Sequence, residues 1–256
     1  MLDRMVAGEI ASKPHTALRD GSGRLRHEEC LTRDGFDGPF TIMYHVERPH
    51  TAAVTTAAHG WEIPEAVDDK LIPVEAHGIK FLSLGQLVSP GHALAWRGPM
   101  ATGALANLME ADWGDAELLL VDLPPGTGDV QLSLIQRSRP AGAVIVSTPQ
   151  DLSLIDARRA VDLFNKMSVP VLGIIENMAT YECPHCGGES HPFGTGGAEA
   201  AATELGVPFL GRLPLSPSIR EASDAGSPPA AGDTDEARIF EAIAKTLTER
   251  LETPVH

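Results

Sequence analysis

Apolar residues occur along this chain in short continuous runs that alternate with segments of helical periodicity. From about residue 65 onward, the runs predict buried strands and the periodic segments predict helices. The predicted strands are residues 79–84, 118–121, 143–148, 169–175 and 207–213. The predicted helices are residues 99–109, 129–137, 152–167, 198–205 and 235–251. Strands that alternate with helices pair in parallel through right-handed crossovers, so the pattern predicts a doubly wound α/β fold with a mostly parallel sheet.

The first 64 residues differ in character from the rest of the chain. They lack long apolar runs, and they hold five of the ten histidines. Their best strand candidate is residues 40–46, which a Gly-Pro pair precedes and Pro49 follows. We expect a boundary near Pro64, with a short N-terminal appendage at residues 1–64 and the α/β domain at residues 65–256.

Composition narrows the classes of function. The chain has 256 residues, of which 43% are hydrophobic, and a net charge of −15. No apolar run has the length of a membrane span, and the N-terminus shows no apolar signal segment, so we expect a cytoplasmic protein without a membrane partner. So acidic a chain does not favour a nucleic-acid partner. Three cysteines are too few for a disulfide framework and fit a reducing compartment.

The clearest chemical signal is the segment LLLVDLPPGTGD at residues 118–129. Four apolar residues place Asp122 at the carboxyl edge of a buried strand, which is where open α/β sheets bind ligands. Gly126 and Gly128 let backbone N–H groups approach an anion. An acid followed by such a turn is how P-loop NTPases hold Mg²⁺ and contact the γ-phosphate. A strand-end aspartate that caps a tight turn is the alternative interpretation.

A second signal is the paired thiols of C-P-H-C-G at residues 183–187. Two thiolates on one turn make half of a tetrahedral metal site. The other ligands would come from Cys30, from His185 or His191, or from a second copy of the chain across a twofold axis. On spacing alone, the motif fits zinc and an iron–sulfur cluster equally well.

Two weaker signals lie on either side of the thiols. Asn177 follows a predicted strand, where its amide could bind a nucleobase edge or simply stabilise a turn. Residues 193–197, FGTGG, form a glycine-rich loop that could be no more than the beginning of a helix.

Residues 65–233 resemble the Mrp/ApbC family of iron–sulfur cluster carriers, which are dimeric P-loop ATPases of the deviant-Walker type. The segments that carry the resemblance include WGDAELLLVDLPPGTGDVQLSL, GAVIVSTPQDLSLIDARRA, VPVLGIIENM, CPHCG, FGTGGAEAAA and LGRLPLSPSIREASDAG. The resemblance implies binding of a [4Fe–4S] cluster and its transfer to acceptor apoproteins, together with binding of ATP and Mg²⁺.

The resemblance also implies a role for each candidate residue. Asp122 would be the Walker B acid near Mg²⁺, and Gly126 would lie in the switch loop at the γ-phosphate. Asn177 and Pro214 would line the adenine pocket. Cys183 and Cys186 of two copies would hold one cluster between them in a homodimer.

The chain departs from the family pattern in one respect. Family members carry a phosphate loop of the type G-K-G-G-V-G-K-[ST] on a central strand, whereas this sequence contains no Gly-Lys dipeptide. We therefore expect an incomplete P-loop fold that is missing its phosphate-loop strand and has low stability, with impaired ATP binding and hydrolysis. Whether the chain is an enzyme stays open. The alternative is a non-catalytic chimeric remnant with a structural zinc knuckle.

Residues 10–64 resemble the N-terminal stretch of homogentisate 1,2-dioxygenase. The iron ligands of that family lie farther downstream, in a part that has no counterpart here. His45, His50 and His59 therefore inherit no ligand role from the resemblance.

Overall fold

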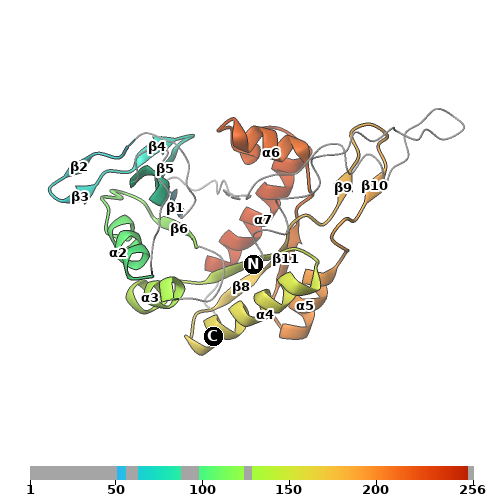
Figure 1. Cartoon of the computed structure of the whole chain (residues 1–256), viewed down its shortest axis with the longest axis horizontal. Coiled ribbons are helices and arrows are strands. Elements are labelled where there is room, and N and C mark those ends of the chain that lie inside the picture. The colour runs from blue at the N-terminus through green and yellow to red at the C-terminus, as the bar shows by residue number, and fades with distance from the viewer. Residues whose placement is uncertain (1–50, 56–62, 88–97, 124–128, 253–256) are drawn as a thin grey trace, which may run out of the picture.

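The computed structural model describes residues 51–55, 63–87, 98–123 and 129–252 (Figure 1). The predicted strand at residues 40–46 and the histidines of the N-terminal segment lie outside these ranges. Within the described ranges, no helix combines the length and hydropathy that a membrane crossing requires.

The first sheet has the strand order β4-β5-β1-β6. Its strands are β4 (Val74–Ala76), β5 (Ile79–Ser83), β1 (Thr51–Thr55) and β6 (Leu118–Asp122). Strand β1 runs parallel to both neighbours, with Ala53 opposite Phe81 on one side and Leu120 on the other. The N-terminal segment thus contributes a strand to this sheet, and the domain boundary near Pro64 stays a prediction.

The second sheet has the order β11-β8-β7 and is entirely parallel. Its strands are β11 (Phe209–Arg212), β8 (Val171–Glu176) and β7 (Ala143–Ser147). Two antiparallel ribbons accompany the sheets: β2 (Ala66–Val67) with β3 (Lys70–Leu71), and β9 (Tyr181–Glu182) with β10 (Glu189–Ser190). In the described part of the chain, β6 and β7 are each hydrogen-bonded to one neighbouring strand only, so the two sheets are not joined there.

Helices cover the sheets as the alternating pattern predicts (Figure 1). The helices are α2 (Gly98–Met109), α3 (Asp129–Ser138), α4 (Asp151–Lys166), α5 (Gly197–Leu205), α6 (Pro217–Asp224) and α7 (Asp235–Glu252), with 3-10 turns η1 (Leu84–Leu87) and η2 (Pro229–Ala231). Helices α2 and α3 pack on the first sheet around Leu82, Leu105 and Leu134.

Adjacent residues of β8 show that helices lie on both faces of the second sheet. Ile174 is fully buried against α4 and α5, where it packs with Leu154 and Ala201. Ile175 is fully buried on the opposite face, where it packs with Phe240 and Ile243 of α7. Because successive side chains of a strand point to opposite faces, a strand buried on both sides is apolar without alternation. The prediction of a doubly wound α/β fold is confirmed.

Candidate functional site

Asp122 lies where the apolar run placed it, at the last position of β6. It is opposite Thr55 in the parallel ladder with β1, and it is exposed at the carboxyl edge of the first sheet. Gly126 lies outside the described residues. An exposed carboxylate at this edge has the chemistry to contact a hydrated Mg²⁺ ion.

Asn177 directly follows β8 in the second sheet. Its backbone N–H donates to the carbonyl of Ser147 at 2.8 Å. Its side-chain Oδ1 accepts the N–H of Met178 at 3.0 Å, and Met178 has a left-handed φ of 56°. Asn177 therefore stabilises a turn through its oxygen. The amide nitrogen is the part of the side chain that could donate to a ligand.

Pro214 lies beside the segment that carries Asn177. On its two sides, Leu213 donates its N–H to the carbonyl of Glu176 at 2.8 Å, and Leu215 donates to that of Thr180 at 2.7 Å. Ala179 in turn donates to the carbonyl of Leu213 at 3.0 Å. These bonds hold residues 213–215 along residues 176–180, so Asn177 and Pro214 come together although 37 positions separate them in the sequence.

The two candidate metal ligands lie on the ribbon of β9 and β10, which we call the thiol hairpin (residues 181–190). Cys183 donates its N–H to Gly188 at 3.0 Å, and its carbonyl accepts the N–H of Gly187 at 2.8 Å. Both cysteines are in the thiol form. Cys183 is only 1% exposed, whereas Cys186 is partly exposed.

The base of the thiol hairpin is a small apolar core of its own. Tyr181, Cys183 and Leu215 are buried together, with Met178 and Phe193 packed against them. A β-ribbon of two short strands is marginal by itself, so this core is what gives the hairpin a defined orientation.

Within its described residues, one copy of the chain offers only part of a metal site. Among the described residues, no group of three or more His, Cys, Asp or Glu side chains is placed to hold a metal ion. The imidazole of His191 donates from Nδ1 to the carbonyl of Ala179 at 3.0 Å. Cys30 lies outside the described residues. Two thiolates are soft ligands that suit iron–sulfur chemistry or zinc, and they need partners from elsewhere.

Glu176, at the end of β8, is fully buried and was not among the residues predicted for the site. Its carboxylate accepts the N–H groups of Gly196 at 3.2 Å and Ala198 at 2.8 Å, and the Nε–H of Arg212 at 3.1 Å. Arg212 also pairs with Glu199. The signal was present in the sequence, because an acid that ends an apolar strand next to Asn177 requires buried partners.

The glycine-rich loop is the beginning of helix α5. Gly196 has a left-handed φ of 71°, which a glycine adopts without strain. A Cβ on Gly197 would lie 2.5 Å from the carbonyl oxygen of Pro149. The N–H groups of Gly196 and Ala198 bind the chain's own carboxylate, so this loop contacts an internal anion, Glu176.

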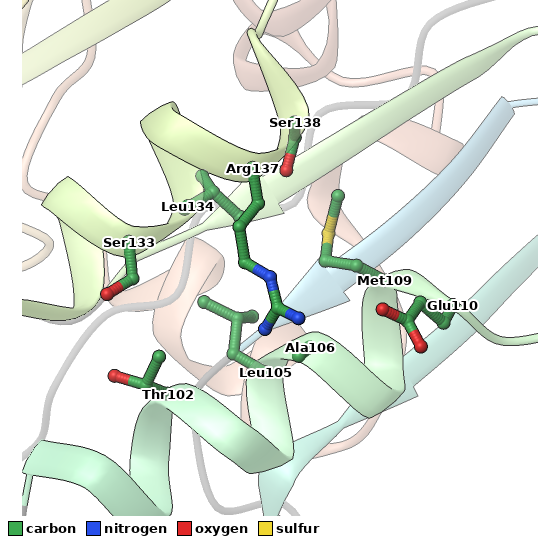
Figure 2. Close-up of a pocket in the computed structure, with 9 residues that line it drawn as sticks. All are labelled: Thr102, Leu105, Ala106, Met109, Glu110, Ser133, Leu134, Arg137 and Ser138. Atoms are coloured by element: carbon green, nitrogen blue, oxygen red, sulfur yellow. The ribbon is translucent and has the colours of Figure 1, made fainter.

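A surface pocket of about 230 Å³ lies between α2 and α3, in another part of the molecule (Figure 2). Leu105 and Leu134 are buried in it, and the exposed side chains of Arg137 and Glu110 also line it. Figure 2 shows Arg137 reaching from α3 towards α2. None of the site residues expected from the sequence lines this pocket.

Comparison with known proteins identifies the family. Residues 49–248 match the model of a ParA-type family described as the NUBPL iron-transfer P-loop NTPase. The chain belongs to this family. The match agrees with the resemblance that residues 65–233 show to Mrp/ApbC proteins, which is thereby confirmed.

The curated relatives carry iron–sulfur names. An "Iron-sulfur cluster carrier protein" of Pseudomonas fragi is 46% identical over 187 residues, which is 72% of this chain and 65% of that protein. The "Iron-sulfur protein required for NADH dehydrogenase, mitochondrial" of Arabidopsis thaliana is 51% identical over 162 residues, or 63% of this chain and 52% of that protein. This chain therefore spans between half and two thirds of the length of these relatives.

Solved structures show the same fold. A nucleotide-binding protein from Archaeoglobus fulgidus in complex with ADP has a TM-score of 0.56 and 32% identity, covering 70% of this chain and 74% of that chain. The septum site-determining protein MinD of Pyrococcus horikoshii, complexed with Mg-ADP, has a TM-score of 0.53 and 20% identity, over 77% of this chain and 82% of that chain.

Proposed function

We propose that this chain is an iron–sulfur cluster carrier that holds a [4Fe–4S] cluster between two copies and transfers it to acceptor apoproteins. The observation that carries the proposal is the thiol hairpin, which holds Cys183 and Cys186, both in the thiol form, three positions apart on one short ribbon. The names of the family and of its curated relatives support the iron–sulfur assignment.

Symmetry would supply the ligands that the described residues of one copy do not provide. A [4Fe–4S] cluster takes four thiolates, and a twofold axis at the hairpin would bring Cys183 and Cys186 of each copy to the same cluster. Figure 1 shows the ribbon of β9 and β10 beyond the strands of the second sheet, away from α2 and α3. A site between two copies also exposes the cluster to an acceptor when the copies separate.

The nucleotide part of the proposal concerns the carboxyl edges of the two sheets. Asp122 and Gly126 would lie near Mg²⁺ and the γ-phosphate, and Asn177 and Pro214 would line the adenine pocket. Bound Mg²⁺ would neutralise phosphate charge. The sequence has no Gly-Lys pair to cradle the phosphates, so we expect ATP binding to be weak and hydrolysis to be slow.

Anaerobic reconstitution with iron and sulfide tests the carrier function. The full chain should turn brown and elute as a dimer with about four iron and four sulfide per two chains. Cys183→Ala and Cys186→Ala should each abolish the colour, and Cys30→Ala is the matched control that should keep it. The loaded chain should then restore activity to an apoenzyme that requires a [4Fe–4S] cluster.

Two results would contradict the proposal. A chain that stays monomeric and colourless in the presence of iron and sulfide is not a cluster carrier. About one zinc per dimer with no iron would instead favour the zinc-knuckle alternative.

A further inference from the structure

The thiols lie on a long excursion of the chain between β8 and α5. This excursion, residues 177–196, begins with Asn177, carries the thiol hairpin and ends in the glycine-rich loop, whose last residue begins α5. Glu176 is the residue immediately before it. The N–H groups that its carboxylate accepts, from Gly196 and Ala198, lie 20 and 22 positions later in the sequence. A single side chain therefore joins the two ends of the excursion.

The carboxylate of Glu176 is buried, so it depends on the hydrogen-bond donors that surround it. Glu176 is 0% exposed and lies on β8, opposite Ser147 of β7 and Arg212 of β11. Bonds from N–H donors to an ionised carboxylate are shorter and stronger than neutral ones. A buried carboxylate is stable only when such donors surround it. A glutamine at position 176 would direct its NH₂ group at a donor instead of accepting a hydrogen bond from it. At least one of the three bonds to the carboxylate would then be lost.

Further contacts connect the segment held by Glu176 to the thiol hairpin. Ala179, on the arm before the hairpin, donates to the carbonyl of Leu213, the residue after β11, at 3.0 Å, and it accepts from His191 on the arm after the hairpin. The first arm is thus tied both to the segment that follows β11 and to the second arm. Tyr181 and Phe193, one on each arm, meet in the apolar core beside Cys183. Because both ends of the excursion are held at Glu176, the segments before and after the hairpin have a fixed alignment relative to each other.

We propose that Glu176 is a positioning residue for the metal-binding thiols: it closes the excursion at its base and thereby orients Cys183 and Cys186 for ligation. The inference rests on the proposed function, since it concerns how the same thiols are held. Glu176 itself contacts no metal. Its effect is to reduce the conformational freedom that the excursion would lose when metal binds.

Cobalt titration of the full chain tests this role. A sulfur-to-metal charge-transfer band appears when thiolates bind Co²⁺, so this band reports ligation by the cysteines. Competition with a chelator gives the affinity of the chain for Co²⁺. Glu176→Gln should weaken Co²⁺ binding by about tenfold, the equivalent of one charge-assisted hydrogen bond. Glu199→Gln is the matched control, because Glu199 pairs with the same Arg212 but its side chain is 50% exposed. The control should stay within about twofold of the wild type.

The outcomes separate this inference from the proposed function. Equal Co²⁺ affinity in the folded Glu176→Gln and Glu199→Gln chains would overturn the inference and leave the carrier proposal intact. A lower melting temperature with unchanged affinity would mean that Glu176 only stabilises the fold, and would also overturn it. Absence of the charge-transfer band in the wild-type chain would overturn the proposed function and, with it, the inference.

Amide hydrogen exchange of the wild-type chain gives a second measurement if Glu176→Gln does not fold. The amides of Gly196 and Ala198 should exchange more slowly than those at residues 185–188, because they donate to a buried carboxylate. Exchange at the base as fast as at the hairpin tip would show that the junction is open in solution, and would overturn the inference.

Discussion

The imidazole of His191 donates from Nδ1 to the backbone carbonyl of Ala179, at 3.0 Å, across the base of the thiol hairpin. Its Nε2 lies 3.7 Å from Oε1 of Glu189 on the same hairpin. His191 was one of the possible metal ligands expected from the sequence. In the folded chain its Nδ1 ties the two arms of the excursion together, and its role as a metal ligand stays a prediction.

Replacing His191 by Ala should loosen the hairpin by removing this hydrogen bond, and it should remove no ligand, because the proposed ligands are the thiolates of Cys183 and Cys186. Loss of one hydrogen bond of this kind costs about 1 kcal/mol, so Co²⁺ affinity should fall by a few fold while the charge-transfer spectrum keeps its shape. Glu182→Ala, an exposed change on the same hairpin, is the control. A changed spectrum at saturation in His191→Ala would show that His191 is a ligand after all.

The two thiols should react at different rates. Cys183 is 1% exposed under Tyr181 and Leu215, whereas Cys186 is partly exposed, so an alkylating reagent reaches Cys183 only when the hairpin opens. In a Cys30→Ser background, Cys186 should be modified at least about tenfold faster. Peptide mass spectrometry over time measures both rates. Similar rates for the two would contradict the buried position of Cys183.

Gly197, at the beginning of α5, is closely packed, and Gly103 in α2 is a matched control. Gly197→Ala would place a Cβ 2.5 Å from the carbonyl oxygen of Pro149, and should lower the free energy of unfolding by about 1–3 kcal/mol. Gly103→Ala, within α2, would meet no atom within 4 Å. That change should raise the free energy of unfolding by about 0.5–1 kcal/mol through helix propensity. Urea denaturation measures both, and equal effects would contradict the close contact at Gly197.

Glu236 should make folding stability depend on pH. Hydrogen bonds lower the pKa of its carboxyl group, chiefly the one from Ser218, with others from its own N–H, Ser216 and Thr234. A carboxyl whose pKa is lower in the folded chain stabilises the fold above its unfolded pKa, about 4.3. The stabilisation disappears as the pH falls from the unfolded-state pKa to below the lowered pKa of the folded chain.

Glu236→Gln should accordingly be less stable than the wild type at pH 7, by less than about 1 kcal/mol because the site is partly solvated. Below the folded-state pKa, the difference between the two chains should vanish. Glu241→Gln, an exposed change on the same helix, is the control. Urea denaturation over a pH series makes the comparison, and a difference that does not change with pH would contradict the role of Glu236.

Much of the fold followed from local patterns. The apolar run at residues 118–121 predicted β6 and put Asp122 at its carboxyl end, where the structure has it. The periodicity at residues 235–251 predicted α7, which runs to Glu252. Helix α6 was not predicted, because it has only eight residues, most of them polar, and none of them is buried.

The candidate site was predicted as separate pieces. Asn177, Pro214 and the two cysteines came from short motifs, and the sequence alone did not show that residues 213–215 lie along residues 176–180. The roles of these residues, and that of Gly126 outside the described ranges, stay predictions. The glycine-rich loop had two interpretations. The structure identifies it as the beginning of α5, where the N–H groups of Gly196 and Ala198 donate to the carboxylate of Glu176.

The amino-acid sequence by itself determined the alternation of strands and helices, the acid at a strand end and the paired thiols, because periodicity and motif spacing are properties of neighbouring residues. Only the tertiary structure decided that β1 lies between β5 and β6, that Glu176 closes the thiol-bearing excursion, and that Cys183 is buried while Cys186 is not. These are contacts between distant segments. They depend on which surfaces pack together when the chain folds, and no local pattern encodes that choice.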